Sequence, residues 1–227
     1  MEKVIREKTI QGDSMDNISI IIRNKNESMH IGYAIQSCLD FFKTPEIIIV
    51  DNDSTDESLD IVMNFNDRTN IKIVKNSVYT PGRSLNIGVK KSSNKYILIL
   101  SGHAQIINLD FQKIKDNLEN YIAVFGKQIP IYKGKKITPR YIWTHFGDDE
   151  VINMNSNLEK RYFFHNAFSF FKRQTLIDIP FDERYGSKED RYWAKEIVKK
   201  GHMYFYDPSL VINHFYTEGG ATWKGIG

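Results

Sequence analysis

Cysteine is nearly absent from this sequence, since Cys38 is the single one among 227 residues. No disulfide can form within such a chain, and this sparse use of cysteine is typical of a reducing compartment. Long apolar runs are also missing: none exceeds five residues, whereas a membrane-spanning helix needs about 20. The opening residues MEKVIREKTI contain no apolar stretch like that of a secretory signal peptide. These absences predict a soluble, cytoplasmic protein.

Neither sign of charge is in large excess. The chain has 31 basic and 28 acidic residues, a formal net charge of +3. This balance is too mild to indicate a nucleic-acid partner. It is compatible with an anionic substrate, or with a peripheral contact at the inner face of a membrane.

The composition is that of a folded globular chain, with 41% hydrophobic and 26% charged residues. Residues 1–17 are polar without a clear period, so we interpret them as an N-terminal extension. A regular pattern begins at Ile18, and we expect residues 18–227 to form a single domain.

The first half of this domain alternates short β-branched runs with helical patterns. Strands are predicted at 18–22, 47–50, 71–74 and 96–100, and apolar residues at helical spacing lie between them. Cys38 falls on one such helix face, which places it in the core. The alternation predicts an α/β fold with a parallel sheet, whose ligands bind at the carboxyl ends of the strands.

The second half follows a different pattern. Residues 127–160 are predicted to be loop-like, residues 161–171 are densely aromatic, and a helix is predicted over 187–200, closed by Gly201. The loop-like region is a candidate acceptor-recognition or lid segment.

Several predicted strand and helix ends carry polar side chains. Asp51 and Asp53 follow the second strand, where a carboxylate can accept hydrogen bonds from a pyrimidine base or from ribose. Ser54 and Glu57 have the spacing of a capping box, and Asp56 suits the positive end of the next helix.

Other candidates follow later in the chain. Arg83 lies in the first turn of a helix, where a cation makes sense if a phosphate docks there. Ser101-Gly102-His103 ends the fourth strand, and an imidazole can bind a metal ion or a phosphate oxygen. Glu189 and Asp190 open the late helix, where acids cap the helix or serve as a general base.

Taken together, these motifs resemble the family-2 glycosyltransferases of the GT-A fold, over about 18–223. The matching segments are ISIIIRNKNE (18–27), VDNDSTD (50–56), PGRSLNIG (81–88), the Glu189-Asp190 pair with Trp193-Ala194 behind it, and the late His214. The resemblance implies a Rossmann-like, mostly parallel sheet flanked by helices. It also implies a nucleotide-binding half at 18–105 and an acceptor-binding half at 106–227.

The resemblance further implies an inverting transfer of a hexosyl or deoxyhexosyl unit. The donor would be a UDP- or dTDP-sugar, and the acceptor a glycan or lipid-linked glycan of the cell surface. Asp190 would be the catalytic base, helped by Glu189. The donor would contact Arg23, Asn26, Glu27, Asp51, Asp53, Arg83, Asn86, Ser101, Gly102 and His103. The acceptor would contact His165, Asn166 and Trp193.

One motif departs from the family pattern. An Asp-x-Asp triplet usually follows the fourth strand and binds the metal ion, whereas this chain has Ser101-Gly102-His103. The variant resembles a subgroup that is thought to include rhamnosyltransferases. We expect Mn²⁺ or Mg²⁺ to bind at His103 and His214, and imidazole favours Mn²⁺. The alternative is a direct hydrogen bond from His103 to the diphosphate, with Arg83 supplying the positive charge.

Two other functions stay open. A nucleotidyltransferase of related fold would release pyrophosphate, whereas a glycosyltransferase releases a nucleoside diphosphate. A non-catalytic nucleotide- or glycan-binding module would bind the donor without turnover.

Overall fold

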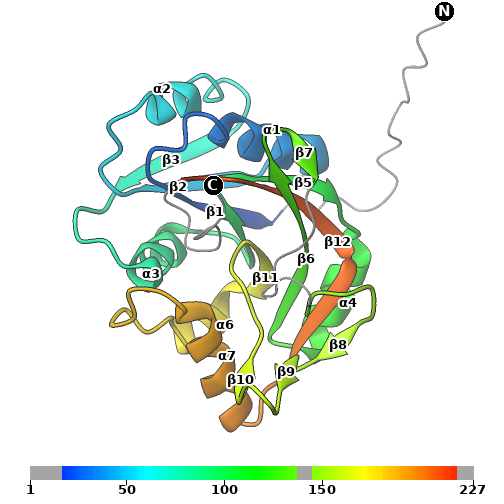
Figure 1. The fold of residues 1–227 in the computed structure, drawn as a ribbon. Coiled ribbons are helices and arrows are strands. Elements are labelled where there is room, and N and C mark those ends of the chain that lie inside the picture. The colour runs from blue at the N-terminus through cyan, green and yellow to red at the C-terminus, as the bar shows by residue number, and fades with distance from the viewer. Residues whose placement is uncertain (1–16, 137–144, 219–227) are drawn as a thin grey trace, which may run out of the picture.

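The computed structural model describes residues 17–136 and 145–218. Its main element is a ten-stranded sheet with the order β3-β2-β1-β4-β11-β6-β12-β5, to which β7 and β8 add at the side (Figure 1). All of the predicted extension except residue 17 lies outside the described residues, as do 137–144 of the expected acceptor segment. No helix among the described residues is long and apolar enough to span a membrane.

The first half has the predicted alternation of strands and helices. In chain order it comprises β1 (Ile18–Asn24), α1 (Ile31–Phe41), β2 (Glu46–Asp51), α2 (Ser58–Met63), β3 (Asn70–Lys75), α3 (Pro81–Lys91) and β4 (Tyr96–Ser101). These four strands pair in parallel throughout. The predicted α/β fold, with a mostly parallel central sheet and flanking helices, is confirmed.

The second half adds further strands around a few helices. They are β5 (Ala104–Asn108), α4 (Phe111–Asn120), β6 (Ala123–Tyr132), β7 (Lys135–Lys136), β8 (Val151–Ile152), β9 (Asn155–Ser156), β10 (Arg161–Tyr162), β11 (Phe168–Lys172), α6 (Arg173–Asp178), α7 (Glu189–Lys199) and β12 (Tyr204–Phe215). The helix predicted over 187–200 is confirmed as α7.

The prediction of a loop over 127–160 is wrong at its start, because β6 continues to Tyr132 and forms a hairpin with β7. The structure explains Gly126 by close packing against β12, since a Cβ atom there would lie 2.5 Å from the carbonyl oxygen of Leu210. Pro130 is accommodated within the strand pairing of β6 with β12.

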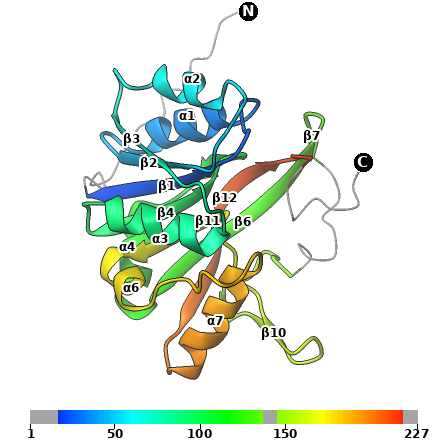
Figure 2. The ribbon, with the colours of Figure 1, turned by 90° about the vertical axis from the view of Figure 1, so that its left-hand side faces the viewer.

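The helices cover both faces of the sheet. Alternate residues of β1 point to opposite sides: Ile20 and Ile22 pack in one apolar core with residues of α1, α2 and α4, and Ile21 packs in the other with residues of α3, α6 and α7. Figure 2 shows α1 and α2 on one side of β1 and α3 on the other. Cys38 is fully buried in the first core, as predicted.

The strand directions define one functional edge. Since β4 is antiparallel to β11 and β11 is antiparallel to β6, strand β6 runs parallel to β1, β2 and β4. Strand β12 is parallel to β6. The carboxyl ends of these five strands therefore lie at the same side of the sheet, which we call the carboxyl edge.

Candidate functional site

The sheet register brings three of the predicted motifs together at the carboxyl edge. In β1, Arg23 lies opposite Ser101 of β4, and Asn24 lies opposite Asp51 of β2. The segments after β1, β2 and β4 are thus neighbours in space. In the sequence, Asp51 lies 28 residues after Arg23, and Ser101 lies 50 residues after Asp51. This is the place where open α/β sheets bind their ligands.

Asp51 and Asp53 occupy different environments. Asp51 is buried, and its carboxylate accepts hydrogen bonds from Asn24 Nδ2 at 2.9 Å and from Ser54 Oγ at 2.6 Å. Asp53 is exposed, with a left-handed φ of 56°. Asp51 therefore organises the end of β2, while the side chain of Asp53 is accessible to a ligand.

The predicted capping box does not form. Helix α2 begins at Ser58 with Glu57 as its N-cap, so the helix starts later than the motif requires. Ser54 Oγ instead accepts the backbone N–H of Asn26 at 3.0 Å, and the Asn26 side chain accepts the N–H of Thr55 at 2.8 Å. These bonds join the loops that follow β1 and β2.

Arg83 is held at the start of α3 by polar neighbours. Its Nε donates to Asn76 Oδ1 at 3.3 Å, and its guanidinium lies 3.5 Å from the carboxylate of Glu183. The Arg83 side chain is 44% exposed, so solvent and ligands can reach it. Its position at a helix N-terminus suits an anion.

Asn86 has a buried, structural environment. Its amide donates to the carbonyl of Phe181 at 2.8 Å and accepts the N–H of the same residue at 3.1 Å. It also donates to Glu183 Oε1 at 3.0 Å. These bonds tie α3 to the loop that leads into α7.

His103 makes a close contact with an acid from the opposite loop. Its Nδ1 lies 2.8 Å from Glu27 Oε1, and its Nε2 lies 3.4 Å from Ser101 Oγ. Gly102, between Ser101 and His103, allows the backbone of Arg23 to approach closely, because a Cβ atom at position 102 would lie 3.0 Å from the carbonyl oxygen of Arg23. Glu27 Oε2 is buried and has no hydrogen-bond partner among the described residues.

His214 lies against His103, with ring centroids 4.7 Å apart. The ring of His214 is buried, and burial together with the neighbouring His103 holds the pKa of His214 well below its usual value. Burial likewise lowers the pKa of His30, whose ring stacks on Phe215. Three histidines from distant parts of the sequence thus line this corner of the edge.

Glu189 and Asp190 begin α7, after Lys188 in the left-handed region with φ 69°. Glu189 is buried, and its carboxylate lies 3.7 Å from the guanidinium of Arg23. Burial and the neighbouring charge of Glu189 raise the pKa of Asp190 to about 7. A carboxyl group with such a pKa can accept a proton near neutral pH.

The expected acceptor residues lie in the interior. Trp193 is 3% exposed, and its indole donates to the carbonyl of Ile179 at 2.8 Å, so it offers no free face to a sugar ring. His165 is buried against the carbonyl of Gly126, and burial lowers its pKa to about 3. Both side chains were expected at the acceptor, and in the structure both are core residues.

Asn166 is buried as well, but it lies beside the site. The carbonyl of the next residue, Ala167, accepts the N–H of Ser101 at 3.0 Å. The Nδ2 atom of Asn166 has no hydrogen-bond partner among the described residues.

Few side chains in the described part of the chain are arranged so that they could coordinate a metal ion. In the part of the chain that the structure describes, no three His, Cys, Asp or Glu side chains are grouped so as to hold a metal ion. The expected ligands His103 and His214 do lie together, and an imidazole held by a carboxylate, as His103 is by Glu27, is a common arrangement for a metal ligand. The residues fit a metal that arrives with a diphosphate, and they do not form a protein-only metal centre.

Sequence reasoning missed the polar network beneath these candidates. Asn52 Oδ1 accepts hydrogen bonds from Asn76 Nδ2 at 3.0 Å and from Ser84 Oγ at 2.9 Å, and all three side chains are buried. The available signal was their position, since Asn52 and Asn76 each directly follow a strand.

Comparisons with known proteins identify the family of this chain. A family model described as glycosyl transferase family 2 matches residues 19–179. The chain is 25% identical over 191 residues to the GalNAc(5)-diNAcBac-PP-undecaprenol beta-1,3-glucosyltransferase of Campylobacter jejuni, covering 82% of this chain and 61% of that relative. A dolichyl N-acetyl-alpha-D-glucosaminyl phosphate 3-beta-D-2,3-diacetamido-2,3-dideoxy-beta-D-glucuronosyltransferase of Methanococcus voltae is 24% identical, over 88% of this chain and 67% of that relative.

The fold is also that of a solved structure. The crystal structure of Staphylococcus aureus TarS, residues 1–349 in complex with UDP-GlcNAc, matches with a TM-score of 0.70 at 18% identity. The match covers 93% of this chain and 62% of that one. This chain is thus shorter than the proteins it resembles, spanning about three fifths of the TarS structure and of the Campylobacter relative.

Proposed function

Since the chain belongs to glycosyl transferase family 2, we propose that it moves a sugar from a nucleotide-diphosphate sugar to an acceptor hydroxyl, with inversion at the anomeric carbon. The observation that carries this proposal is the position of Asp190. Its carboxyl group, with a pKa raised to about 7, lies next to Glu189, which reaches Arg23 at the carboxyl edge. This contact supports an acid close to the strand ends at which a donor would bind.

The donor proposal rests on exposed polar groups around the carboxyl edge. Asp53 is accessible to hydrogen bonds from a base or ribose, and Arg83 is accessible to the diphosphate. Asn26 and Asp51 support this site by fixing the two loops. The solved TarS structure contains UDP-GlcNAc, which favours a UDP-sugar over a dTDP-sugar for this chain as well.

In the proposed reaction the acceptor oxygen attacks the anomeric carbon from the face opposite the diphosphate. The new carbon–oxygen bond forms as the bond to the leaving phosphate oxygen breaks. Asp190 takes the proton of the acceptor hydroxyl, and Glu189 lies beside it, 3.7 Å from the guanidinium of Arg23. General-base help of this kind contributes about 10²–10⁴ in rate.

The leaving diphosphate needs compensation for its negative charge. His103, fixed by Glu27, is the residue that would hold Mn²⁺ or Mg²⁺ together with the diphosphate, and His214 packs against it. A metal ion bound there supplies positive charge to the leaving group. Arg83 supplies a further cation from the start of α3.

The acceptor proposal comes from the relatives. Two of them have names that include an undecaprenol or a dolichyl phosphate carrier. We propose a lipid-linked glycan as the acceptor and a hexosyl or deoxyhexosyl unit as the transferred group. We also propose that the protein acts at the inner face of the membrane.

The test is to identify the released product. The full chain is incubated with a panel of UDP- and dTDP-sugars, with and without Mn²⁺, and the nucleotide products are separated. The proposal expects a nucleoside diphosphate from one donor. Pyrophosphate released from a nucleoside triphosphate would indicate a nucleotidyltransferase instead. Donor binding without any product, including slow donor hydrolysis, would indicate a binding module.

A further inference from the structure

The hairpin formed by β6 and β7 carries a compact group of positive charges at the carboxyl edge. Lys133, Lys135 and Lys136 are all exposed within four positions at its tip. None of the three forms an ion pair within the described residues, and the ammonium group of Lys133 lies 5.3 Å from the centre of the Tyr132 ring. We call these three lysines the basic tip.

Ring packing and strand pairing join the basic tip to the end of β12. Tyr132 packs edge-on against Tyr216, with ring centroids 4.9 Å apart. The N–H of Tyr216 donates to Ile131 at 2.9 Å, and the preceding Phe215 pairs with the same residue in the sheet. Strand β12 therefore fixes the hairpin to the body of the molecule.

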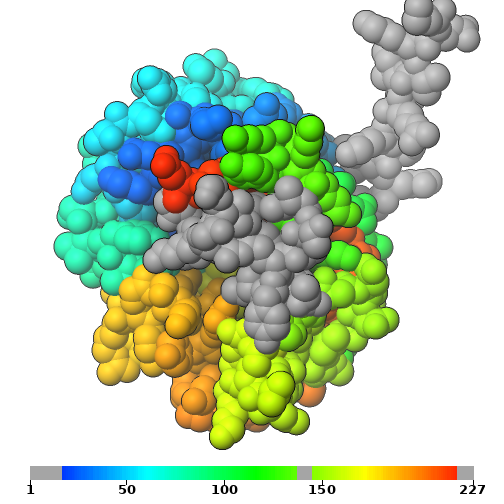
Figure 3. All heavy atoms as spheres, in the orientation of Figure 1, coloured from blue at the N-terminus to red at the C-terminus, as the bar shows by residue number. Residues whose placement is uncertain are grey.

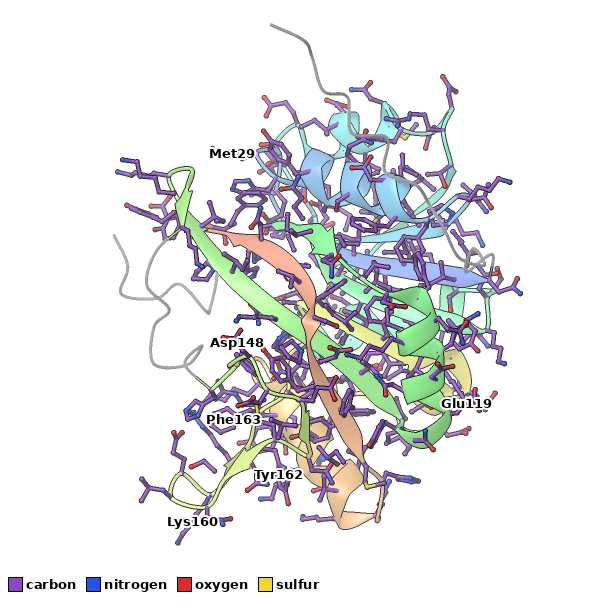
Figure 4. All side chains as sticks on the ribbon, turned by 90° about the vertical axis from the view of Figure 1, so that its right-hand side faces the viewer. Met29, Glu119, Asp148, Lys160, Tyr162 and Phe163 are labelled. Atoms are coloured by element: carbon purple, nitrogen blue, oxygen red, sulfur yellow. The ribbon has the colours of Figure 1, made fainter. Side chains whose placement is uncertain are left out.

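Exposed apolar side chains on α1 and on the residues before it lie next to the end of β12. Met29 is 78% exposed and Tyr33 is 55% exposed, and the ring of Tyr33 lies 5.6 Å from that of Phe215. Figure 4 shows Met29 at the same corner as the hairpin, and Figure 3 shows the green hairpin residues beside blue residues of the first half and the red end of β12. Lysines next to exposed aromatic and Met side chains are suited to a membrane interface.

The sequence around the hairpin strengthens the charge argument. From Lys133 to Gly147 the chain contains four Lys or Arg residues and no Asp or Glu, whereas Lys127 is paired with Asp148. The net charge of the whole chain is only +3, so positive charge is concentrated in this segment. An anionic surface is the complementary partner, since polybasic segments bind acidic phospholipid headgroups.

We propose that the basic tip, with Met29 and Tyr33 beside it, docks this protein on an anionic phospholipid surface. The carboxyl edge with its candidate donor site then faces the membrane side, where the head of a lipid-linked acceptor is found. The inference deepens the proposed function and rests on it only for the acceptor. The docking itself depends on the charges and the exposed apolar residues.

The test compares two charge variants of the full chain by co-sedimentation with vesicles, without any donor present. One variant carries Lys133→Gln, Lys135→Gln and Lys136→Gln. The matched control carries Lys90→Gln, Lys91→Gln and Lys95→Gln, three exposed lysines located at the end of α3 and just before β4, on the opposite edge of the sheet. Both variants lose the same charge.

We expect the unmodified chain to bind vesicles of phosphatidylcholine mixed with phosphatidylglycerol, and to bind pure phosphatidylcholine much more weakly. A lysine near an anionic surface contributes about five-fold to binding, so the hairpin variant should lose on the order of 100-fold. The control variant should keep binding within about five-fold of the unmodified chain.

Two results would overturn the proposal: no binding to the anionic vesicles, or an equal loss in both variants. Thermal unfolding of each variant establishes that it is folded. Product release with a soluble acceptor is measured separately, so a failure of docking is distinguished from a failure of the transferase assignment.

Discussion

Nδ1 of His103 lies 2.8 Å from Oε1 of Glu27, which joins the turn after β4 to the loop after β1. A carboxylate can only accept at this contact, so Nδ1 carries the hydrogen and Nε2 is left for a ligand beside Ser101 Oγ. We therefore propose that Glu27 is a positioning residue for the His103 imidazole.

Replacing Glu27 by Gln should weaken Mn²⁺-dependent binding of the nucleoside diphosphate by about 10- to 100-fold, because the orientation of the imidazole is lost. The measurement is calorimetric titration of UDP with and without Mn²⁺. Glu57→Gln, a change of the same type at an exposed position, serves as the control. Unaltered Mn²⁺-dependent affinity in Glu27→Gln would show that Glu27 does not orient a metal-binding imidazole.

Asp190 should make the protein less stable as the pH rises. Burial and Glu189 raise its pKa from 3.8 to about 7. Between these values the folded state keeps the proton that the unfolded state has lost, so the free energy of unfolding falls with rising pH and then levels off. The asparagine side chain of Asp190→Asn cannot ionise, so the free energy of unfolding of this variant does not fall in this way.

The melting temperature of Asp190→Asn should therefore exceed that of the unmodified protein by a margin that widens from about pH 5 to about pH 8. In a chain of this size each 1 kcal/mol corresponds to about 2–4 °C. Thermal unfolding followed by circular dichroism measures the margin. A constant or shrinking margin would mean that the carboxyl group of Asp190 has an ordinary pKa in the folded state.

Asn86 should be needed for stability and for the placement of α7. Its side chain makes buried hydrogen bonds to both backbone polar groups of Phe181, and Asn86→Ala leaves them unpaired at a cost of roughly 1–3 kcal/mol each. Denaturant unfolding measures this loss, with Asn64→Ala at an exposed position as the control. Equal stability of the two variants would argue against this role.

The first half of the fold was predictable from sequence because its strands are buried on both faces. Runs such as Ile20-Ile21-Ile22 appear as continuous apolar segments, and the helices between them have one apolar face. In the second half, β6 and β12 pair across about 80 residues of chain. No local pattern specifies such pairing, and β6 was missed for this reason.

The candidate site was predictable where a motif coincides with a strand end. Asp51, His103 and the Glu189-Asp190 pair lie at or near the carboxyl edge, as expected from their positions in the sequence. Trp193 and His165 could not be assigned from sequence, because an aromatic residue at helical spacing or in an aromatic run has the same pattern in a core and in a groove. In the structure both side chains are buried.

The most direct test of the proposed mechanism compares turnover and donor binding in Asp190→Asn. The control is Glu196→Gln, an exposed acid on the same helix. We predict that Asp190→Asn lowers kcat by about 10²–10⁴ and leaves the Kd for the donor within a few-fold, while Glu196→Gln changes neither. Near-normal turnover in Asp190→Asn would contradict the assignment of Asp190 as the base that deprotonates the acceptor.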